Sequence, residues 1–203
     1  KQLVRRKAVK VYPSSPLGEK TGLPTGRDVE LEPLVDFRRN GVSENTIHGA
    51  VSWYSGDQKI HAWGGNVLCY GRSMMKPFYI KVFADELNDV TDWKQKAISL
   101  ASHNGTASHV EAAQSLLSEG EWGLMLTPLD LPLVQFGRQV RRPRRWYNNS
   151  SGHHAAILKG CRIKGWNRAG YTLPNHPVFK AYLEVVKAYL GENYEASSVA
   201  RDG

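Results

Sequence analysis

The chain has 203 residues, 41% of them hydrophobic, and a formal net charge of +8 at pH 7. This length suffices for one domain with its own core, and the two cysteines, Cys69 and Cys161, exclude a disulfide framework or a metal site built on cysteine spacing. The basic N-terminal segment has no apolar run long enough for a signal peptide or a membrane span, so we expect no membrane partner. We expect Cys69 to be a buried free thiol, which favours a reducing, cytoplasmic setting.

The positive charge makes nucleic-acid binding a hypothesis to weigh, because clustered Lys and Arg neutralise phosphates. The densest basic run, residues 138–147, ends in Trp146 and Tyr147, and single strands bind such runs by charge and stacking. The run leads directly into Asn149, and no nucleic-acid fold motif surrounds it. We favour a solvated loop or a funnel for an anionic substrate, and expect no nucleic-acid partner.

Proline, glycine and charged residues fill the first 40 residues, which we interpret as an extended N-terminal arm able to wrap a partner chain. Alternating residues then predict a β-hairpin, with strands at 47–54 and 59–63 around the turn 55–58. Apolar periodicity and end signals predict helices further along the chain. These helices cover residues 74–87, 92–100, 108–118 and 178–190. We expect Met74 and Met75 to lie in the core.

Ser73 and Lys76 lie three residues apart at the expected start of the first helix, with Pro77 tolerated only near that start. Residues at this spacing share a helix face, so the amine can take the proton of a hydroxyl that attacks a carbonyl. This Ser-x-x-Lys arrangement is that of serine β-lactamases and penicillin-binding proteins. For the motif alone, an exposed helix start capped by a serine is the alternative.

Two further polar segments follow in loops. The first, Ser102-His103-Asn104-Gly105, is expected between two helices and takes the place of the Ser-Asp-Asn element of those enzymes. The second runs from Asn149 to His154. A histidine here could donate to a substrate carboxylate or serve as a general base near pH 7. His154 could equally be a satisfied buried histidine.

The ordered set of motifs, rather than any one of them, resembles the rhizobial-type L-asparaginases. The set comprises Arg72-Ser73-x-x-Lys76-Pro77, Ala101-Ser102-His103, Asn149-x-Ser151-Gly152-x-His154, Gly170-Tyr171 and His176-Pro177. The resemblance extends from about Glu44 to Gly203. It implies an α/β (α+β) fold like that of serine β-lactamases and penicillin-binding proteins, incomplete without a C-terminal half.

The resemblance also implies roles for individual residues. Ser73 and Lys76 would form one nucleophile–base pair, and Ser102 would be a second catalytic serine. The residues expected to contact the substrate are Arg72, His103, Asn149, Ser150, Gly152 and His153.

The family binds zinc near the substrate through a Cys and a Lys, at the positions that Ser150 and His153 occupy here, and through a later Cys. Serine is a poor zinc ligand compared with a thiolate, so this chain keeps at most one strong ligand. We therefore expect no metal and no other cofactor.

In domain terms, the resemblance gives an arm at residues 1–40 and the N-terminal half of a catalytic domain at 41–203. The C-terminal half, with a second catalytic lysine, would be a second chain. Because the chain stops at Asp202-Gly203, where the family continues, we expect a precursor cleaved after Gly203, perhaps autoproteolytically.

The leading functional hypothesis is an amidohydrolase that acts on a small-molecule carboxamide by a Ser/Lys mechanism. An acyl or amide-bond transferase would differ only in admitting an amine in place of water. A catalytically silent binding subunit is the third alternative, which the replaced metal ligands favour and the joint presence of Ser73, Lys76 and Ser102 opposes.

Overall fold

The computed structural model describes residues 31–64, 71–127 and 145–190, which fall into two compact units. Unit 1 ends at Tyr70 and unit 2 begins at Gly71. Most of the expected N-terminal arm, residues 128–144 with much of the basic run, and Cys69 lie outside the described residues. No helix in the described ranges is long and apolar enough to cross a membrane.

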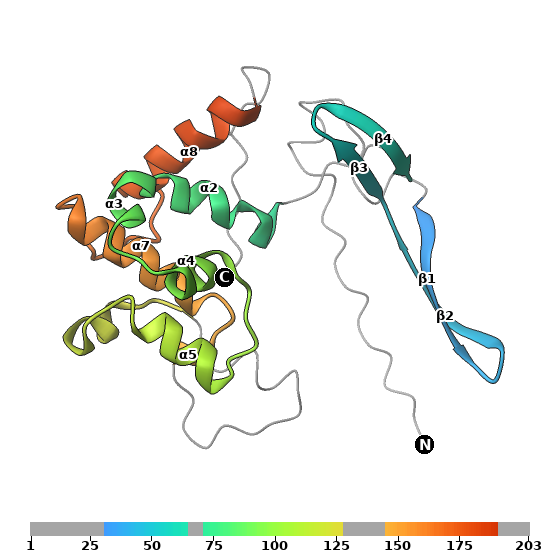
Figure 1. Ribbon diagram of the computed structural model, residues 1–203, viewed down its shortest axis with the longest axis horizontal. Helices are drawn as coiled ribbons and strands as arrows, with labels where there is room; N and C mark the ends of the chain where they lie inside the picture. Colours follow the sequence, from blue (N-terminus) through green and yellow to red (C-terminus); the bar gives the residue numbers. More distant parts are fainter. Residues whose placement is uncertain (1–30, 65–70, 128–144, 191–203) are drawn as a thin grey trace, which may run out of the picture. The chain divides into compact units, whose positions relative to one another are not determined.

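Unit 1 consists of two antiparallel hairpins (Figure 1). Strands β1 (Glu32–Arg39) and β2 (Val42–Gly49) are joined at Asn40-Gly41, where both residues have positive φ, as the favoured two-residue hairpin turn requires. Strands β3 (Val51–Ser55) and β4 (Gln58–Trp63) form the second hairpin. The predicted second hairpin is present, but residues 47–49 of its expected first strand belong to β2, and β1 occupies residues that the sequence places in the arm.

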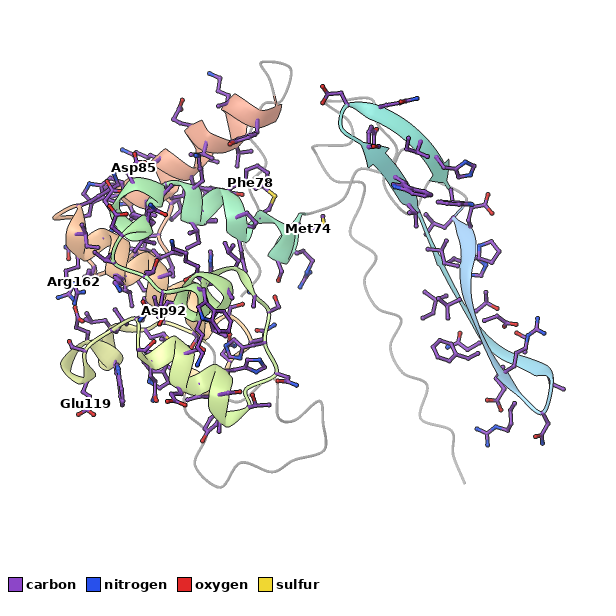
Figure 2. The ribbon with its side chains drawn as sticks, viewed as in Figure 1. Met74, Phe78, Asp85, Asp92, Glu119 and Arg162 are labelled. Atoms are coloured by element: carbon purple, nitrogen blue, oxygen red, sulfur yellow. The ribbon has the colours of Figure 1, made fainter. Side chains whose placement is uncertain are left out.

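Large apolar side chains of unit 1 stand exposed on the hairpins (Figure 2). They are Leu34, Val35, Phe37, Val42, Ile47, Val51, Trp53, Tyr54, Ile60 and Trp63. A single two-stranded hairpin is marginally stable in water, and a third strand or a packed helix is what normally stabilises one.

Unit 2 is helical. Its elements are η1 (Arg72–Met75), α2 (Lys76–Lys81), α3 (Ala84–Asn88), α4 (Trp93–Leu100), α5 (Ala107–Gln114), η2 (Glu119–Leu124), η3 (Arg145–Tyr147), α7 (Ser151–Ile163) and α8 (Pro177–Leu190). Helix α7 packs against α2, α3, α4 and α5, and α8 packs against α2 (Figure 1). The helices and small antiparallel sheets together fit the predicted mixed α and β class.

The predicted helices are largely present, with one division and one omission. The stretch 74–87 is divided into η1, α2 and α3, and Met74, at its start, is 68% exposed rather than in the core. Helix α4 begins as predicted, because the Asp92 carboxylate accepts the Gln95 N–H at 2.8 Å and caps it. Helix α7 was not predicted, because its first turn, Ser151 to His154, falls in a polar, glycine-containing segment that the sequence places in a loop.

The core of unit 2 is built around α7, whose residues from Ser151 to Cys161 are buried apart from the half-buried His154. Two glycines allow this close packing. A Cβ at Gly152 would lie 2.4 Å from the Ile98 carbonyl oxygen of α4, and one at Gly160 would lie 2.4 Å from the Phe83 ring. Only glycine therefore permits these two approaches without a shift of the neighbours.

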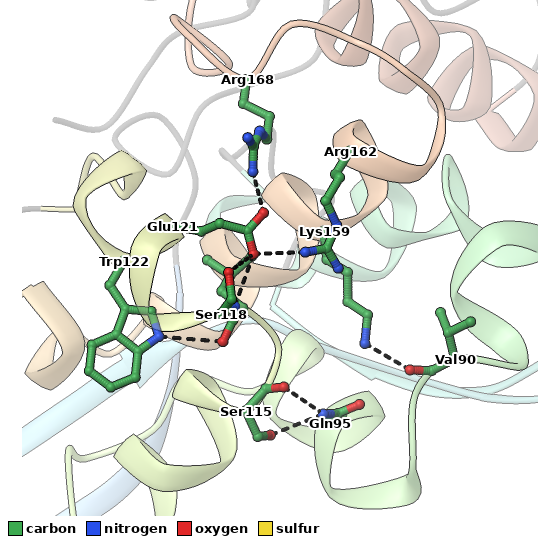
Figure 3. A network of polar contacts seen from close by, with 10 residues as sticks. Val90, Gln95, Ser115, Ser118, Glu121, Trp122, Lys159, Arg162 and Arg168 are labelled. Carbon is green, nitrogen blue, oxygen red and sulfur yellow. Dashed lines mark hydrogen bonds and ion pairs between the residues drawn. The ribbon is translucent and has the colours of Figure 1, made fainter.

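One ionic cluster links η2 to the end of α7 and the loop after it (Figure 3). The buried carboxylate of Glu121 accepts hydrogen bonds from the Ser118 backbone and hydroxyl at 2.9 and 2.7 Å, and it pairs with Arg162 at 2.7 Å and with Arg168. Burial alone would raise the carboxyl pKa, but the Ser118 hydrogen bonds and Arg162 outweigh it and lower the pKa to about 2.

Candidate active site

Lys76 and Ser102 lie in direct contact, although 26 residues separate them in the chain. Lys76 is the first residue of α2 and only 5% exposed, and its Nζ donates to Ser102 Oγ at 2.9 Å and to the Ala101 carbonyl at 2.7 Å. Ser102 itself is exposed, in the loop that leaves α4. An amine beside an accessible hydroxyl is the arrangement that activates a serine nucleophile.

Ser73 lies one turn before Lys76, in η1, and is exposed. Its carbonyl accepts the Lys76 backbone N–H, which fixes the spacing between them. The preceding residue, Arg72, has φ +45°, a left-handed conformation rare for a residue with a long side chain. Backbone strain of this kind concentrates at functional sites and loop clamps.

His103 attaches the Ser102 loop to the start of α7. Its backbone N–H donates to the Asn149 carbonyl at 3.0 Å, and its Nε2 lies 2.9 Å from Ser151 Oγ. Since Ser151 Oγ already donates to the Trp146 carbonyl and Gly105 N–H donates to His103 Nδ1, the imidazole carries its proton on Nε2. Burial, followed by the nearby His109 and Lys76, lowers the His103 pKa to about 4.

His153 is buried in the first turn of α7. Its Nδ1 lies 3.1 Å from the Ser99 carbonyl, which can only accept, so Nδ1 bears the proton and Nε2 the lone pair. The ring also meets Tyr79 edge to face at 5.6 Å. Burial first, then His154 and Lys76, lower the pKa to about 3. At pH 7 His153 is therefore a neutral hydrogen-bond acceptor, and a much weaker base than the sequence hypothesis requires.

The structure separates the expected substrate-binding residues into two groups. Arg72 and Asn149 are exposed and Ser150 is half-buried, so they are accessible from solvent. The other three are buried, and their contacts lie inside the protein; they are His103, Gly152 and His153. The residues of the first group can therefore contact a substrate directly. His103 and Gly152 instead join the Ser102 loop and α4 to the start of α7.

Sequence reasoning missed a polar pair beside this site. His154 Nδ1 lies 2.7 Å from the Tyr171 hydroxyl, and Leu126 N–H donates to that hydroxyl at 3.0 Å. Burial and then Lys76 lower the His154 pKa to about 4, and burial raises the Tyr171 pKa. The signals for this pair, Gly170-Tyr171 and the second histidine, are present in the sequence, but the contact between them depends on the fold.

The residues at the family's zinc positions do not fit a zinc site. The Ser150 hydroxyl has only a 3.5 Å contact, with Asn149 Oδ1, and His153 has one nitrogen committed to Ser99. Across residues 31–64, 71–127 and 145–190, no three His, Cys, Asp or Glu residues are grouped as a metal site requires. An alcohol and one imidazole nitrogen are too few strong ligands for zinc, so we derive no step through a metal.

The family model for L-asparaginase II matches residues 35–203, most of the chain. The chain belongs to the L-asparaginase II family. This confirms the resemblance drawn from the ordered motifs and makes the protein an amidohydrolase of the asparaginase type, a hydrolase acting on amide C–N bonds. No curated protein matches the chain.

Proposed function

We propose that this protein hydrolyses a small-molecule carboxamide by a Ser/Lys mechanism in which the Lys76 amine is the base for Ser73 and Ser102. The observation that carries the proposal is the 2.9 Å contact between Lys76 Nζ and Ser102 Oγ, with Ser73 one turn before Lys76. Membership of the family indicates that the bond hydrolysed is an amide C–N bond. The contact between Lys76 and Ser102 supports a lysine amine as the base that activates a serine.

The steps follow from the groups present. An unprotonated Lys76 amine takes the proton of a serine hydroxyl as its oxygen attacks the carboxamide carbon. The tetrahedral intermediate collapses to an acyl-enzyme, and the C–N bond breaks as the proton held by Lys76 passes to the leaving nitrogen, releasing ammonia. Water, deprotonated by the same amine, then attacks the ester carbon. The bond from this carbon to the serine oxygen breaks, Lys76 returns the proton to that oxygen, and the acid is released. Ser102 either attacks or relays the proton between Ser73 and Lys76.

A neutral imidazole supports this site without exchanging protons. His103 attaches the Ser102 loop to α7 through the Asn149 carbonyl and the Ser151 hydroxyl. Because the pKa of His103 is about 4, its imidazole is neutral at pH 7 and above, the range in which a lysine amine can act as a base. The hydrogen bonds that attach the Ser102 loop to α7 therefore persist at neutral pH.

The β-lactamase-like architecture and a C-terminal half supplied as a second chain belong to the same proposal. The exposed apolar residues of β1 to β4 support it, because unaccompanied hairpins are marginal and apolar strands with unpaired edges recruit further strands. Intact-mass analysis of the purified full-length protein tests it: two fragments of one precursor support cleavage, and a single unbroken chain contradicts it. A cytoplasmic location also stays a prediction.

Ammonia release from L-asparagine, L-glutamine and simple amides tests the function directly. Ser73→Ala should lower turnover by roughly three or more powers of ten, because residues that act as a nucleophilic unit lose most activity singly. Ser108→Ala is the matched control, since Ser108 is also exposed and its hydroxyl contacts only Thr106 among the described residues. Wild-type protein that releases no ammonia from any carboxamide would contradict the proposal, and an active Ser73→Ala variant would remove Ser73 from it.

A further inference from the structure

His154 and Tyr171 form a polar pair that the mechanism above does not use. His154 lies in the first turn of α7, and Tyr171 lies in the loop between α7 and α8. The phenol is 3% exposed, and its oxygen is shared by the Leu126 N–H at 3.0 Å and by His154 Nδ1 at 2.7 Å. A buried phenol with two partners is fixed in position, so it constrains the imidazole that it contacts.

The hydrogen-bond inventory of this pair selects one tautomer of His154. A phenol has one proton to donate, and leaving that proton unpaired inside a protein is costly. Leu126 N–H can only donate, so it occupies an acceptor position of the oxygen. The phenol proton therefore goes to His154 Nδ1, and the imidazole proton lies on Nε2.

His154 lies near α2, the helix that begins at Lys76. The His154 ring meets the His153 ring edge to face at 6.1 Å, and the His153 ring meets the ring of Tyr79, in α2, at 5.6 Å. His154 is also the one half-buried residue between Ser151 and Cys161. Among the residues that the structure describes, none accepts a hydrogen bond from its Nε2–H. A neutral donor is thus held near α2, and none of the described residues takes its proton.

We propose that His154 Nε2–H donates a hydrogen bond to an acceptor oxygen of the amide substrate, and that Tyr171 is the positioning residue that holds His154 in this tautomer. The inference rests on the proposed function, because it takes the Lys76–Ser102 pair as the reacting centre. The oxygen recognised is a carbonyl or a carboxylate oxygen, since each accepts from a neutral N–H.

Histidine tautomers are measurable by long-range proton–nitrogen correlation spectra of the folded full-length protein, with the His154 signals assigned from a His154→Gln sample. We expect the Nε2–H form in the wild type and a mixture of forms in Tyr171→Phe. Tyr189→Phe is the control, because Tyr189 is 63% exposed and contacts the Phe78 ring through its own ring, which phenylalanine retains. A wild-type Nδ1–H form, or an unchanged tautomer in Tyr171→Phe, would overturn the positioning role.

Binding is tested by titrating L-asparagine while following the His154 Nε2 signal, which is independent of turnover. A shift that saturates is expected, and no shift alongside normal turnover would sink the inference while leaving the proposed function intact. Absence of turnover in the wild type would instead count against the proposed function, and the titration would still decide whether His154 binds.

Kinetics then identify the oxygen. His154→Phe should raise KM roughly five- to tenfold, the usual cost of one neutral hydrogen bond, with a smaller change in kcat. His154→Gln should recover most of this loss, because its amide N–H lies near the place of Nε2. If the rise occurs with both L-asparagine and β-alaninamide, which lacks the α-carboxylate, the oxygen is the carbonyl, and if with asparagine alone, it is the carboxylate. Equal KM values for wild type and His154→Phe would overturn the proposal.

Discussion

Lys76 Nζ and Ser102 Oγ lie 2.9 Å apart, and this contact joins the first turn of α2 to the loop that follows α4. The Ala101 carbonyl takes a second hydrogen bond from the same amine at 2.7 Å, which orients it toward the loop. The lysine of the Ser-x-x-Lys motif therefore contacts a serine from another segment, and its backbone N–H donates to the Ser73 carbonyl one turn earlier. This makes Lys76 the residue that connects the two serine motifs.

Zinc content follows from the residue at position 150. Because Ser150 stands where the resemblance to the rhizobial-type enzymes implies a thiolate ligand, mild chelation should leave well below one zinc per chain and should not alter folding. Elemental analysis and circular dichroism before and after chelation measure both. Retention of one zinc that is lost in His153→Ala would contradict this prediction.

Gly152 should tolerate no side chain. A Cβ there would lie 2.4 Å from the Ile98 carbonyl oxygen, so Gly152→Ala should destabilise unit 2 by about 1–3 kcal/mol through overpacking. Gly123→Ala is the control, because no atom lies within 4 Å of a Cβ at that position. Urea unfolding of both variants measures the difference. Equal stability of the two would show that α4 and α7 do not approach as closely as described.

Glu121→Gln should weaken the link between η2 and the end of α7 by about 1–3 kcal/mol, because two arginines lose their charged partner. The folded pKa of about 2 lies below the ordinary 4.5, so the wild-type carboxylate stabilises fully above pH 4.5 and loses this contribution as the pH falls toward 2. Glu119→Gln, an exposed neighbour, should change little. The difference in the free energy of unfolding between wild type and Glu121→Gln should decrease below pH 4.5, as measured by urea unfolding over a pH series. A difference that does not change with pH would contradict the lowered pKa of Glu121.

Two buried histidines, His103 and His153, and the half-buried His154 predict a loss of stability in acid that begins at a higher pH than the loss expected from Glu121. The pKa values of His103, His153 and His154 are lowered to about 4, 3 and 4 from 6.5, so their contribution is complete above pH 6.5. Below that pH the unfolded chain binds protons that the folded one refuses, and stability falls by up to about 1.4 kcal/mol per pH unit for each histidine. Unfolding curves between pH 7.5 and 5 test this, and His103→Gln should flatten the slope. A flat wild-type profile would show that these rings protonate in place.

The sequence predicts helix starts and turns well where residues adjacent in the chain determine them. The start of α4 near Asp92 and the turn of the second hairpin are both set by neighbouring residues, and both are found. Helix α7 was missed because the serines and the glycine at its start, Ser150, Ser151 and Gly152, favour a loop, whereas its packing depends on segments far away in the chain. The orientation of His103 was also beyond the sequence, because it depends on carbonyl groups and hydroxyls 46 to 48 residues away.

Membership of a family and the order of its motifs indicate which residues belong to the candidate site, but they do not show which side chains are in contact with one another. The sequence pairs Lys76 with Ser73, whereas the structure shows the Lys76 amine in contact with Ser102 and with the Ala101 carbonyl. Buried polar networks of this kind form only when segments far apart in the chain fold together.

A double-mutant cycle on Lys76 and Ser102 tests the central claim most directly. Turnover of L-asparagine is measured for wild type, Lys76→Met, Ser102→Ala and the double variant, with folding checked by circular dichroism and with Lys94→Met, at an exposed lysine, as control. If the two residues act as one unit, each single change costs roughly as much as both together, typically several powers of ten in kcat. Losses in the single variants that simply multiply in the double variant would show that the residues act independently, and would contradict the account.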